Sequence, residues 1–185
     1  MRVIGGKARG MRLDSVPGDS TRPILDRVRT ALFDILRPRL AGIRMLDVFG
    51  GSGSVGIEAL SQGAAHCTFL DINNNAFKTI RKNLEHTKLS EQALVFNTDA
   101  FSFLRRSTEQ FDLIYVAPPQ FKGIWLEALH TIAERPALLA PGGLIVAQID
   151  PMEYEPLALT GFHETRQAKY GKTLLVFIEP LNAPN

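Results

Sequence analysis

The sequence has only one cysteine, Cys67, among its 185 residues. An intrachain disulfide is therefore impossible, but a chain of this length can bury a sufficient hydrophobic core without one. Chains without disulfides are typical of reducing compartments, so we predict a cytoplasmic protein. We expect Cys67 itself to be a small apolar residue inside a strand.

Long hydrophobic runs and clustered metal ligands are also missing. The first ten residues contain no apolar stretch of the signal-peptide kind, and no later run is long enough to span a bilayer, so we expect no membrane partner. Four scattered histidines without a cysteine cluster predict no metal site. Hydrophobic residues make up 45% of the chain and charged residues 22%, which is ordinary for a globular protein.

The net charge is small but unevenly distributed. The formal charge is +2 overall. Residues 1–39 contain nine Lys and Arg against four Asp and Glu, whereas residues 40–185 contain twelve against fifteen. A basic segment on a mildly acidic body is typical of proteins that bind a polyanion such as nucleic acid. A solvated basic surface without a partner is the alternative interpretation.

The N-terminal part predicts a hairpin or extended arm followed by a helix. Residues 1–20 are rich in Gly and Arg and contain only short apolar pieces. Apolar residues at helical spacing then predict a helix over residues 25–36, which Pro38 should end. We interpret residues 1–40 as a basic N-terminal extension and residues 41–185 as the main domain.

Strand and helix patterns alternate from residue 43 onward. Strands are predicted at 43–48, 66–70, 94–96, 113–116 and 144–147, and helices near 55–60, 77–84, 100–106 and 123–139. This alternation predicts an α/β fold with a parallel sheet covered on both faces. Two apolar runs near 161–163 and 174–178 follow, with a turn at 170–173 between them, so this last pair should be antiparallel.

A glycine-rich segment carries the clearest functional signal. Gly51, Gly53 and Gly56 match the pattern G-x-G-x-x-G between a predicted strand and a predicted helix. Glycines allow a tight turn and a close ligand, and the helix start offers free N–H groups. Asp71 ends the next strand, where it could hold ribose hydroxyls. NAD and S-adenosylmethionine both fit this pattern, and a ligand-free turn is a third interpretation.

Three observations favour S-adenosylmethionine. Asp47 lies just before the glycines, where a carboxylate would repel a pyrophosphate but attract the cationic methionine end of this cofactor. Asp99 follows the third strand and could accept a hydrogen bond from an adenine amino group. The chain also ends after what looks like one sheet, which leaves little room for the substrate domain of a dehydrogenase.

Several segments resemble the bacterial 16S ribosomal RNA guanine-N2 methyltransferases of the RsmD type. These are Arg2-Val-Ile-Gly-Gly-Lys, Thr21-Arg-Pro-Ile-Leu-Asp-Arg-Val-Arg-Thr-Ala-Leu-Phe-Asp-Ile-Leu36, Asp47-Val-Phe-Gly-Gly-Ser-Gly-Ser-Val-Gly-Ile-Glu-Ala-Leu60, Phe111-Asp-Leu-Ile-Tyr-Val-Ala-Pro-Pro119 and Tyr170-Gly-Lys-Thr. They cover nearly the whole chain in the right order. The Thr21–Leu36 block is the most family-specific of them, whereas the glycine loop is shared by many methyltransferases.

The resemblance implies a Rossmann-like class I methyltransferase fold with a seven-stranded, mostly parallel sheet, an antiparallel last strand and a small N-terminal extension that grips ribosomal RNA. It also implies that Asp47 and the glycines seat the methionine part of the cofactor, Asp71 the ribose, and Asp99 with Ala100 the adenine, with Ile72 against the ring. The candidate cofactor residues are Asp47, Phe49, Gly51, Gly53, Asp71, Ile72, Asp99 and Ala100.

The acceptor loop departs from the family pattern. The resemblance implies an Asn/Asp-Pro-Pro-aromatic loop, whose side-chain oxygen and proline carbonyl accept the hydrogens of the target amine while the ring stacks on a flipped base. This chain has Ala117, Pro118, Pro119 and Gln120 as its candidate catalytic residues. Ala117 removes the side-chain acceptor and Gln120 replaces the ring, so the backbone carbonyls, notably that of Pro118, remain as acceptors.

Neighbouring side chains are candidates to replace the missing groups. Gln120 offers a carbonyl oxygen, and Phe121 or Trp125 could supply a stacking face. For the two aromatic residues, packing of the following helix is the competing interpretation. Six basic residues are predicted to contact RNA: Lys7, Arg9, Arg12, Arg22, Arg27 and Arg29.

The sequence therefore predicts methyl transfer from S-adenosylmethionine to a guanine N2 of small-subunit ribosomal RNA, free or in an assembling particle. The main alternative is a catalytically weakened protein of the same fold that binds the cofactor and RNA. An adenine-N6 DNA methyltransferase fits less well. Such enzymes also need the acceptor loop that is altered in this chain, and they usually have a larger recognition region. Asp47 argues against a nicotinamide oxidoreductase, because its carboxylate would repel the pyrophosphate of NAD.

Overall fold

The computed structural model describes residues 1–18 and 24–181. Two compact units make up the chain, Met1–Asp99 and Ala100–Asn185. The predicted division between residues 1–40 and 41–185 stays a prediction.

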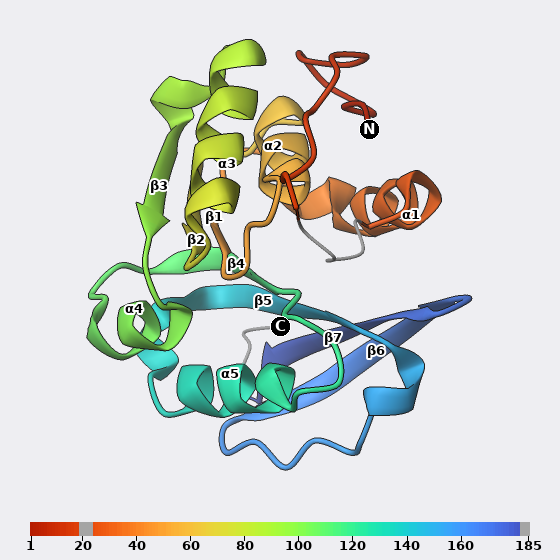
Figure 1. Ribbon diagram of the computed structural model, residues 1–185. Coiled ribbons are helices and arrows are strands. Elements are labelled where there is room, and N and C mark those ends of the chain that lie inside the picture. Colours follow the sequence, from red (N-terminus) through yellow and green to blue (C-terminus); the bar gives the residue numbers. More distant parts are fainter. Residues whose placement is uncertain (19–23, 182–185) are drawn as a thin grey trace. The chain divides into compact units, whose positions relative to one another are not determined.

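The strands form one seven-stranded sheet in the order β3-β2-β1-β4-β5-β7-β6 (Figure 1). Strand β7 is antiparallel to both β5 and β6, while β2 is parallel to β1 and β3, and β4 to β5. The predicted α/β sheet with an antiparallel last strand is therefore confirmed. The strands are β1 Arg44–Asp47, β2 His66–Asp71, β3 Ala93–Asn97, β4 Phe111–Val116, β5 Leu139–Ile149, β6 Phe162–Tyr170 and β7 Thr173–Pro180.

Five α-helices occur among the described residues, namely α1 Asp26–Leu36, α2 Ser54–Ser61, α3 Asn74–His86, α4 Ala100–Arg106 and α5 Ile124–Ala133. The helix predicted near 123–139 is shorter than expected. It ends at Ala133, and a separate 3₁₀ turn, Pro136–Leu138, follows. Pro136 has no N–H to donate, which favours the start of a new turn over continuation of the helix.

The first unit buries an apolar core between β1, β2 and the helices α2 and α3. Met45, Leu46 and Phe69 have no exposed surface, and neither does Cys67. The prediction that Cys67 is an apolar strand residue is confirmed, and burial raises the pKa of its thiol well above the usual value.

The N-terminal residues form the predicted hairpin and pack on the first unit. Two backbone hydrogen bonds, Val3 N–H to the Met11 carbonyl and Leu13 N–H to the Met1 carbonyl, pair its two sides at 2.9 Å. Val3 and Leu13 are each only 2% exposed. The hairpin also bonds to the end of α2, where the Ala8 N–H donates to Ser61 Oγ at 2.9 Å. It is therefore a docked segment rather than a free arm.

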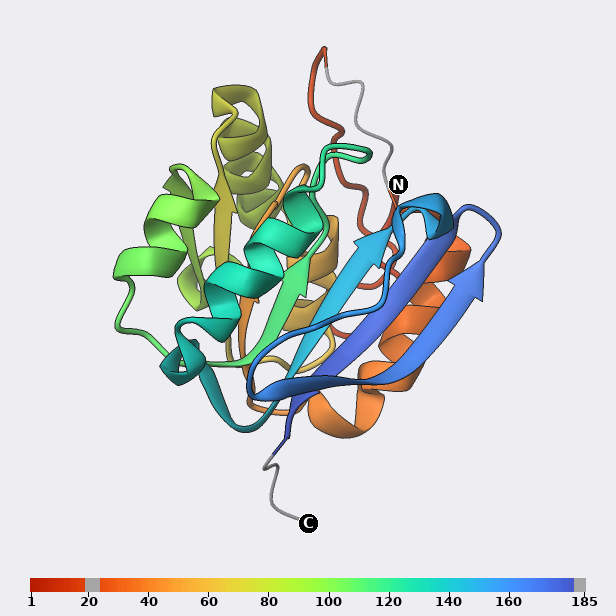
Figure 2. The ribbon, with the colours of Figure 1, turned by 90° about the horizontal axis from the view of Figure 1, so that it is seen from below.

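In the second unit, β6 and β7 form a long antiparallel hairpin beside β5 (Figure 2). Tyr170 pairs with Thr173 at its tip, which confirms the turn predicted at 170–173. Strand β6 is longer than the short apolar run at 161–163 suggested, because its outer part is built from polar residues that face solvent.

Candidate cofactor site and acceptor loop

The glycine loop connects β1 to α2, as the pattern predicted. Gly51 and Gly53 have φ angles of +57° and +80°, which favour glycine over any residue with a side chain. The Gly53 N–H donates to the Gly50 carbonyl at 2.8 Å, and α2 begins at the next residue, Ser54. The loop thus reverses the chain tightly and leaves the start of a helix directly after it.

Asp71, at the end of β2, holds this loop in place. Its Oδ2 accepts a hydrogen bond from the Gly51 N–H at 2.9 Å, and its Oδ1 accepts one from the Asn73 N–H at 2.8 Å. One carboxylate therefore ties the glycine loop to the segment that begins α3. The residue is half-buried, so part of its surface faces solvent.

Asp47 is a buried carboxylate at the end of β1. It is 1% exposed, and its Oδ1 has no hydrogen-bond partner among the described residues. Burial, together with the nearby charge of Asp71, raises the pKa of the Asp47 carboxyl to about 7, although the Gly56 backbone N–H opposes this shift. A cation placed here would relieve the cost of the buried charge and supply the missing partner.

Ile72 leaves a large apolar side chain in solvent at the same end of the sheet. The residue is 73% exposed, while its backbone is held by Asn97, whose Nδ2 donates to the carbonyls of Asp71 and Ile72 at 2.9 and 3.0 Å. An exposed isoleucine on a rigid backbone suits contact with a flat apolar ligand surface.

The structure thus brings Asp47, Gly51, Gly53, Asp71 and Ile72 together within the first unit. Three further predicted cofactor residues are placed as follows. Phe49 is half-buried in the loop, and Asp99 is exposed as the last residue of the first unit. Ala100 is buried and opens α4 as the first residue of the second unit.

The acceptor loop follows β4 in the second unit and leads into α5. Ala117 is half-buried and Pro118 is buried, whereas Pro119 and Gln120 are exposed. The loop has the place in the chain that the sequence predicted, directly after a buried strand. Ala117 offers only its backbone there.

Phe121 has an unusual conformation at the tip of this loop. Its φ is +60°, a value that costs about 1–3 kcal/mol in a residue with a side chain. The residue is 62% exposed, so burial of its side chain does not offset that cost. The backbone N–H donates instead to Oε1 of Glu153 at 2.7 Å, and Oε2 of that carboxylate is buried without a partner among the described residues. Sequence reasoning missed Glu153, since no local pattern links positions so far apart.

Trp125 is a packing residue rather than a stacking face for a base. It is 1% exposed, and its ring stacks on that of Tyr154 with 6.4 Å between centroids and 27° between planes. Of the two aromatic candidates, only Phe121 presents its ring to solvent.

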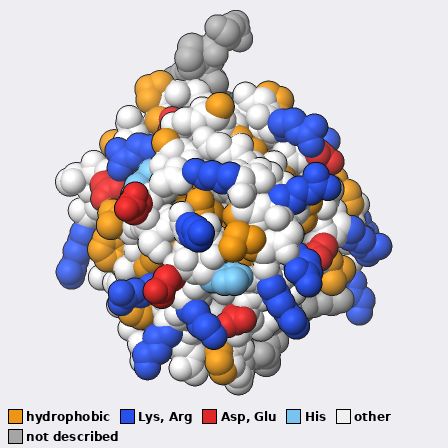
Figure 3. Space-filling model, turned by 90° about the horizontal axis from the view of Figure 1, so that it is seen from above, with side chains coloured by type: hydrophobic (Ala, Val, Ile, Leu, Met, Phe, Trp, Pro, Cys, Tyr) orange, Lys and Arg blue, Asp and Glu red, His pale blue; other side chains and the backbone are white. Residues whose placement is uncertain are grey.

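Four of the six predicted RNA-contact residues have exposed side chains: Lys7, Arg9, Arg12 and Arg27. Lys7 also donates to Gln92 Oε1 at 2.6 Å. Arg22 lies outside the described residues. Figure 3 shows Lys and Arg side chains spread over the face seen from above, with Asp and Glu side chains between them.

Arg29 must be removed from the predicted RNA-contact set, because its side chain is fully buried. Its guanidinium donates to the Arg2 carbonyl and to Asp26 Oδ1, and it pairs with the buried carboxylate of Glu58. The apolar stripe of α1 did not reveal this, because a buried arginine depends on partners from distant segments.

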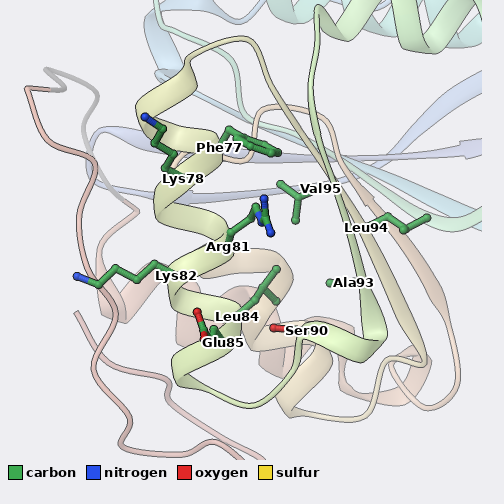
Figure 4. Close-up of a pocket in the computed structure, with 10 residues that line it drawn as sticks. All are labelled: Phe77, Lys78, Arg81, Lys82, Leu84, Glu85, Ser90, Ala93, Leu94 and Val95. Carbon is green, nitrogen blue, oxygen red and sulfur yellow. The ribbon is translucent and has the colours of Figure 1, made fainter.

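A groove of about 900 Å³ lies between α3 and β3. Figure 4 shows Arg81 pointing toward Val95 across the groove, while Lys78 and Lys82 point away from it. The Arg81 guanidinium also lies 5.6 Å from the centre of the Phe77 ring. The groove is therefore partly filled by its own side chains and contains none of the predicted site residues.

Within residues 1–18 and 24–181, His, Cys, Asp and Glu nowhere gather in a group of three or more that could hold a metal ion. In the same part of the chain, every helix is too short or too polar to cross a membrane.

The strand order, the antiparallel β7 and a glycine loop after β1 flanked by two carboxylates define a class I S-adenosylmethionine-dependent methyltransferase fold. Within that class, the chain belongs to the family described as "Conserved hypothetical protein 95", which matches residues 1–179. Its relatives also make it a member of a family of ribosomal RNA methyltransferases. The predicted resemblance to the RsmD type is confirmed.

Individual relatives support this assignment. The chain is 38% identical to YlbH of Bacillus subtilis over 94% of this chain and 95% of that protein. It is 35% identical to the ribosomal RNA small subunit methyltransferase D of Haemophilus influenzae, over 81% and 79% of the two chains. The solved structure of the yhhF protein from Escherichia coli has a TM-score of 0.85 at 32% identity and covers 97% of both chains.

Proposed function

We propose that this chain transfers a methyl group from S-adenosylmethionine to the exocyclic N2 of a guanine in small-subunit ribosomal RNA, in the cytoplasm. The observation that carries the proposal is the buried Asp47 carboxylate, whose Oδ1 has no partner among the described residues. The ribosomal RNA substrate is supported by the relatives, one of which bears the name of a small-subunit RNA methyltransferase at 35% identity.

The residues of the first unit fit the cofactor. Asp47 would pair with the cationic methionine end, which also returns this carboxyl to its charged form. Asp71 would accept from the ribose hydroxyls while it keeps its bond to Gly51. Ile72 would cover one face of the adenine, and Asp99 would accept from the adenine amino group. NAD fits less well, because its pyrophosphate would lie near two carboxylates.

When bound, S-adenosylmethionine supplies the methyl group by in-line displacement, so the protein contributes mainly position and electrostatics. The Pro118 carbonyl is the proposed acceptor for a hydrogen of the guanine amine, and it lies in a loop held after β4. Ala117 provides no second side-chain acceptor. The exposed side chain of Gln120 is the proposed replacement.

Ala117 also favours a second candidate function, a protein that binds cofactor and RNA but transfers methyl groups slowly. A positioned hydrogen-bond partner in a transition state is worth about 2.7–4 kcal/mol, so its loss alone could reduce the rate a hundredfold or more. The two candidates share the fold and the cofactor site and differ only in turnover.

Two experiments test the proposal. Calorimetry with S-adenosylmethionine, its demethylated product and NAD should give heat with the first two and none with NAD. A tritiated-methyl assay on undermethylated small-subunit particles and on free 16S RNA then separates the enzyme from the binding protein. Binding without transfer to either substrate would support the second candidate. A Gln120→Ala variant with undiminished transfer would exclude Gln120 as the acceptor.

A further inference from the structure

Phe121 combines two features, each of which by itself lowers the stability of the fold. A residue with a side chain is held at a φ of +60°, and this large aromatic residue is left 62% exposed. A left-handed residue of this kind persists only where surrounding structure enforces it, and such residues cluster at functional sites. The enforcing contact is the 2.7 Å hydrogen bond from the Phe121 N–H to Glu153 Oε1.

Glu153 is itself held firmly by its neighbours. It ends a 3₁₀ turn, Pro151–Glu153, which Asp150 caps by accepting from the Met152 N–H at 2.9 Å. The next residue, Tyr154, stacks on the buried Trp125 in the first turn of α5. The carboxylate therefore lies on a segment that is fixed at both ends, by the Asp150 cap and by the Tyr154–Trp125 ring pair.

The two oxygens of this carboxylate have different surroundings, and Oε1 is the one that bonds to Phe121. Within the described part of the chain, Oε2 of Glu153 is buried without a hydrogen-bond partner. Burial of a carboxylate oxygen in this way is costly, and the hydrogen bond that Oε1 accepts from the Phe121 N–H offsets part of that cost. A charge-assisted bond to a backbone N–H is stronger than a neutral one, which suits it to hold a strained residue.

We propose that Glu153 is a positioning residue that holds the Phe121 ring as the stacking face for the target base, one residue later than the position now occupied by Gln120. This inference deepens the proposed function and rests on it for the identity of the base. The aromatic surface has not been lost with position 120 but displaced by one residue, and the left-handed backbone at Phe121 compensates for that displacement.

The test is binding of a short single-stranded RNA that contains 2-aminopurine, whose fluorescence is quenched when it stacks on a ring. Wild-type protein should quench it. Phe121→Ala should lose the quenching and bind about tenfold more weakly, because stacking of one base on an aromatic ring has roughly that value, and Phe121→Tyr should retain both. Glu153→Ala should weaken binding severalfold, and Glu153→Gln, which keeps an acceptor oxygen, should have a smaller effect.

Two controls separate positioning from general damage. Glu155→Gln removes an exposed carboxylate two residues away and should leave quenching unchanged. Because Glu153 acts through Phe121, Glu153→Ala should cause no further loss in a Phe121→Ala background. Thermal unfolding of each variant verifies that it is folded.

Equal quenching by wild type and Phe121→Ala, or absence of quenching by the wild type, would overturn the inference whether or not the protein transfers methyl groups. A further loss from Glu153→Ala in the Phe121→Ala background would overturn the positioning role. Failure of the methyl-transfer assay together with normal quenching would instead reject the proposed reaction and leave the stacking role standing.

Discussion

The Arg29 guanidinium and the Glu58 carboxylate form an ion pair in the interior of the first unit, with 3.9 Å between Nε and Oε2 and neither side chain exposed. Glu58 also accepts hydrogen bonds from the backbone N–H groups of Ile4 and Gly5, the shortest at 2.8 Å. Arg29 in turn donates to the Arg2 carbonyl. The pair therefore joins α1 and α2 to the N-terminal hairpin.

Replacement of Arg29 should destabilise the protein rather than weaken RNA binding directly. Arg29→Ala leaves the buried Glu58 carboxylate without its charged partner, which costs about 3–5 kcal/mol. Arg27→Ala, two residues away on the same helix and exposed, should leave the free energy of unfolding nearly unchanged. Chemical denaturation of both variants checks this, and equal midpoints would contradict a structural role for Arg29.

Asp47 should make the stability of the ligand-free protein depend on pH. Its pKa is raised from 3.8 to about 7, so the native state retains a proton that the unfolded state releases between these values. The contribution of Asp47 to stability is therefore lost as pH rises from about 4 to 7, by up to about 4 kcal/mol. Thermal unfolding of wild type and Asp47→Asn at pH 5 and pH 8 measures this effect.

The Asp47→Asn variant isolates this effect from those of other carboxyl groups. The stability of the variant relative to the wild type should be greater at pH 8 than at pH 5. The variant should also have a lower affinity for S-adenosylmethionine in calorimetry. Parallel stability profiles for the two proteins would show that the Asp47 carboxyl titrates normally.

Two glycines of the G-x-G-x-x-G pattern, Gly51 in the loop and Gly56 inside α2, should respond differently to alanine. A Cβ at Gly56 would lie 2.2 Å from Phe69 Cε1 and 2.7 Å from Cys67 Sγ, so Gly56→Ala should cost about 1–3 kcal/mol through overpacking. A Cβ at Gly51 meets nothing within 4 Å, and only its φ of +57° is strained, at about 1 kcal/mol. The denaturation midpoints of the two variants measure these losses of stability. A lower midpoint for Gly51→Ala than for Gly56→Ala would contradict the prediction.

The exposed cations of the hairpin should set the salt dependence of RNA binding. Neutralising Lys7, Arg9 and Arg12 together should reduce the slope of log affinity against log salt by about 2, on the basis of about 0.7 per phosphate contact on single strands. Neutralising Lys169 and Lys172, which are exposed on the β6–β7 hairpin, should change it less. An unchanged slope in the triple variant would remove the hairpin from the proposed RNA surface.

A side-chain acceptor restored at position 117 should accelerate methyl transfer. Ala117→Asn supplies the carbonyl oxygen that the family loop has, and we expect the rate of transfer to rise about tenfold to a hundredfold. Single-turnover transfer to undermethylated particles measures this rate. A variant that binds cofactor normally and yet is no faster than the wild type would show that another group already accepts the hydrogen.

Much of the fold could be read from local patterns. Apolar runs separated by glycines predicted the strands around the cofactor loop. The positions of Gly51 and Gly53 predicted the loop itself. Helix limits were less accurate near Pro136, where a proline started a new turn. Such local features are predictable because periodicity and allowed φ angles belong to the chain itself.

The roles of charged side chains were not predictable in the same way. Arg27 and Arg29 are near neighbours in one helix, yet one is exposed and the other completely buried. Glu153 gave no signal, because its partner Phe121 lies 32 residues away along the chain.

The amino-acid sequence alone determined the class of fold, the place of the cofactor loop and the departure at Ala117, because each depends on residue type and short-range spacing. Tertiary structure alone decided that Arg29 stabilises the interior, that Asp47 Oδ1 is buried without a partner among the described residues, and that Glu153 holds Phe121. Burial and hydrogen bonding depend on which distant segments meet, and that information appears only when the chain is folded.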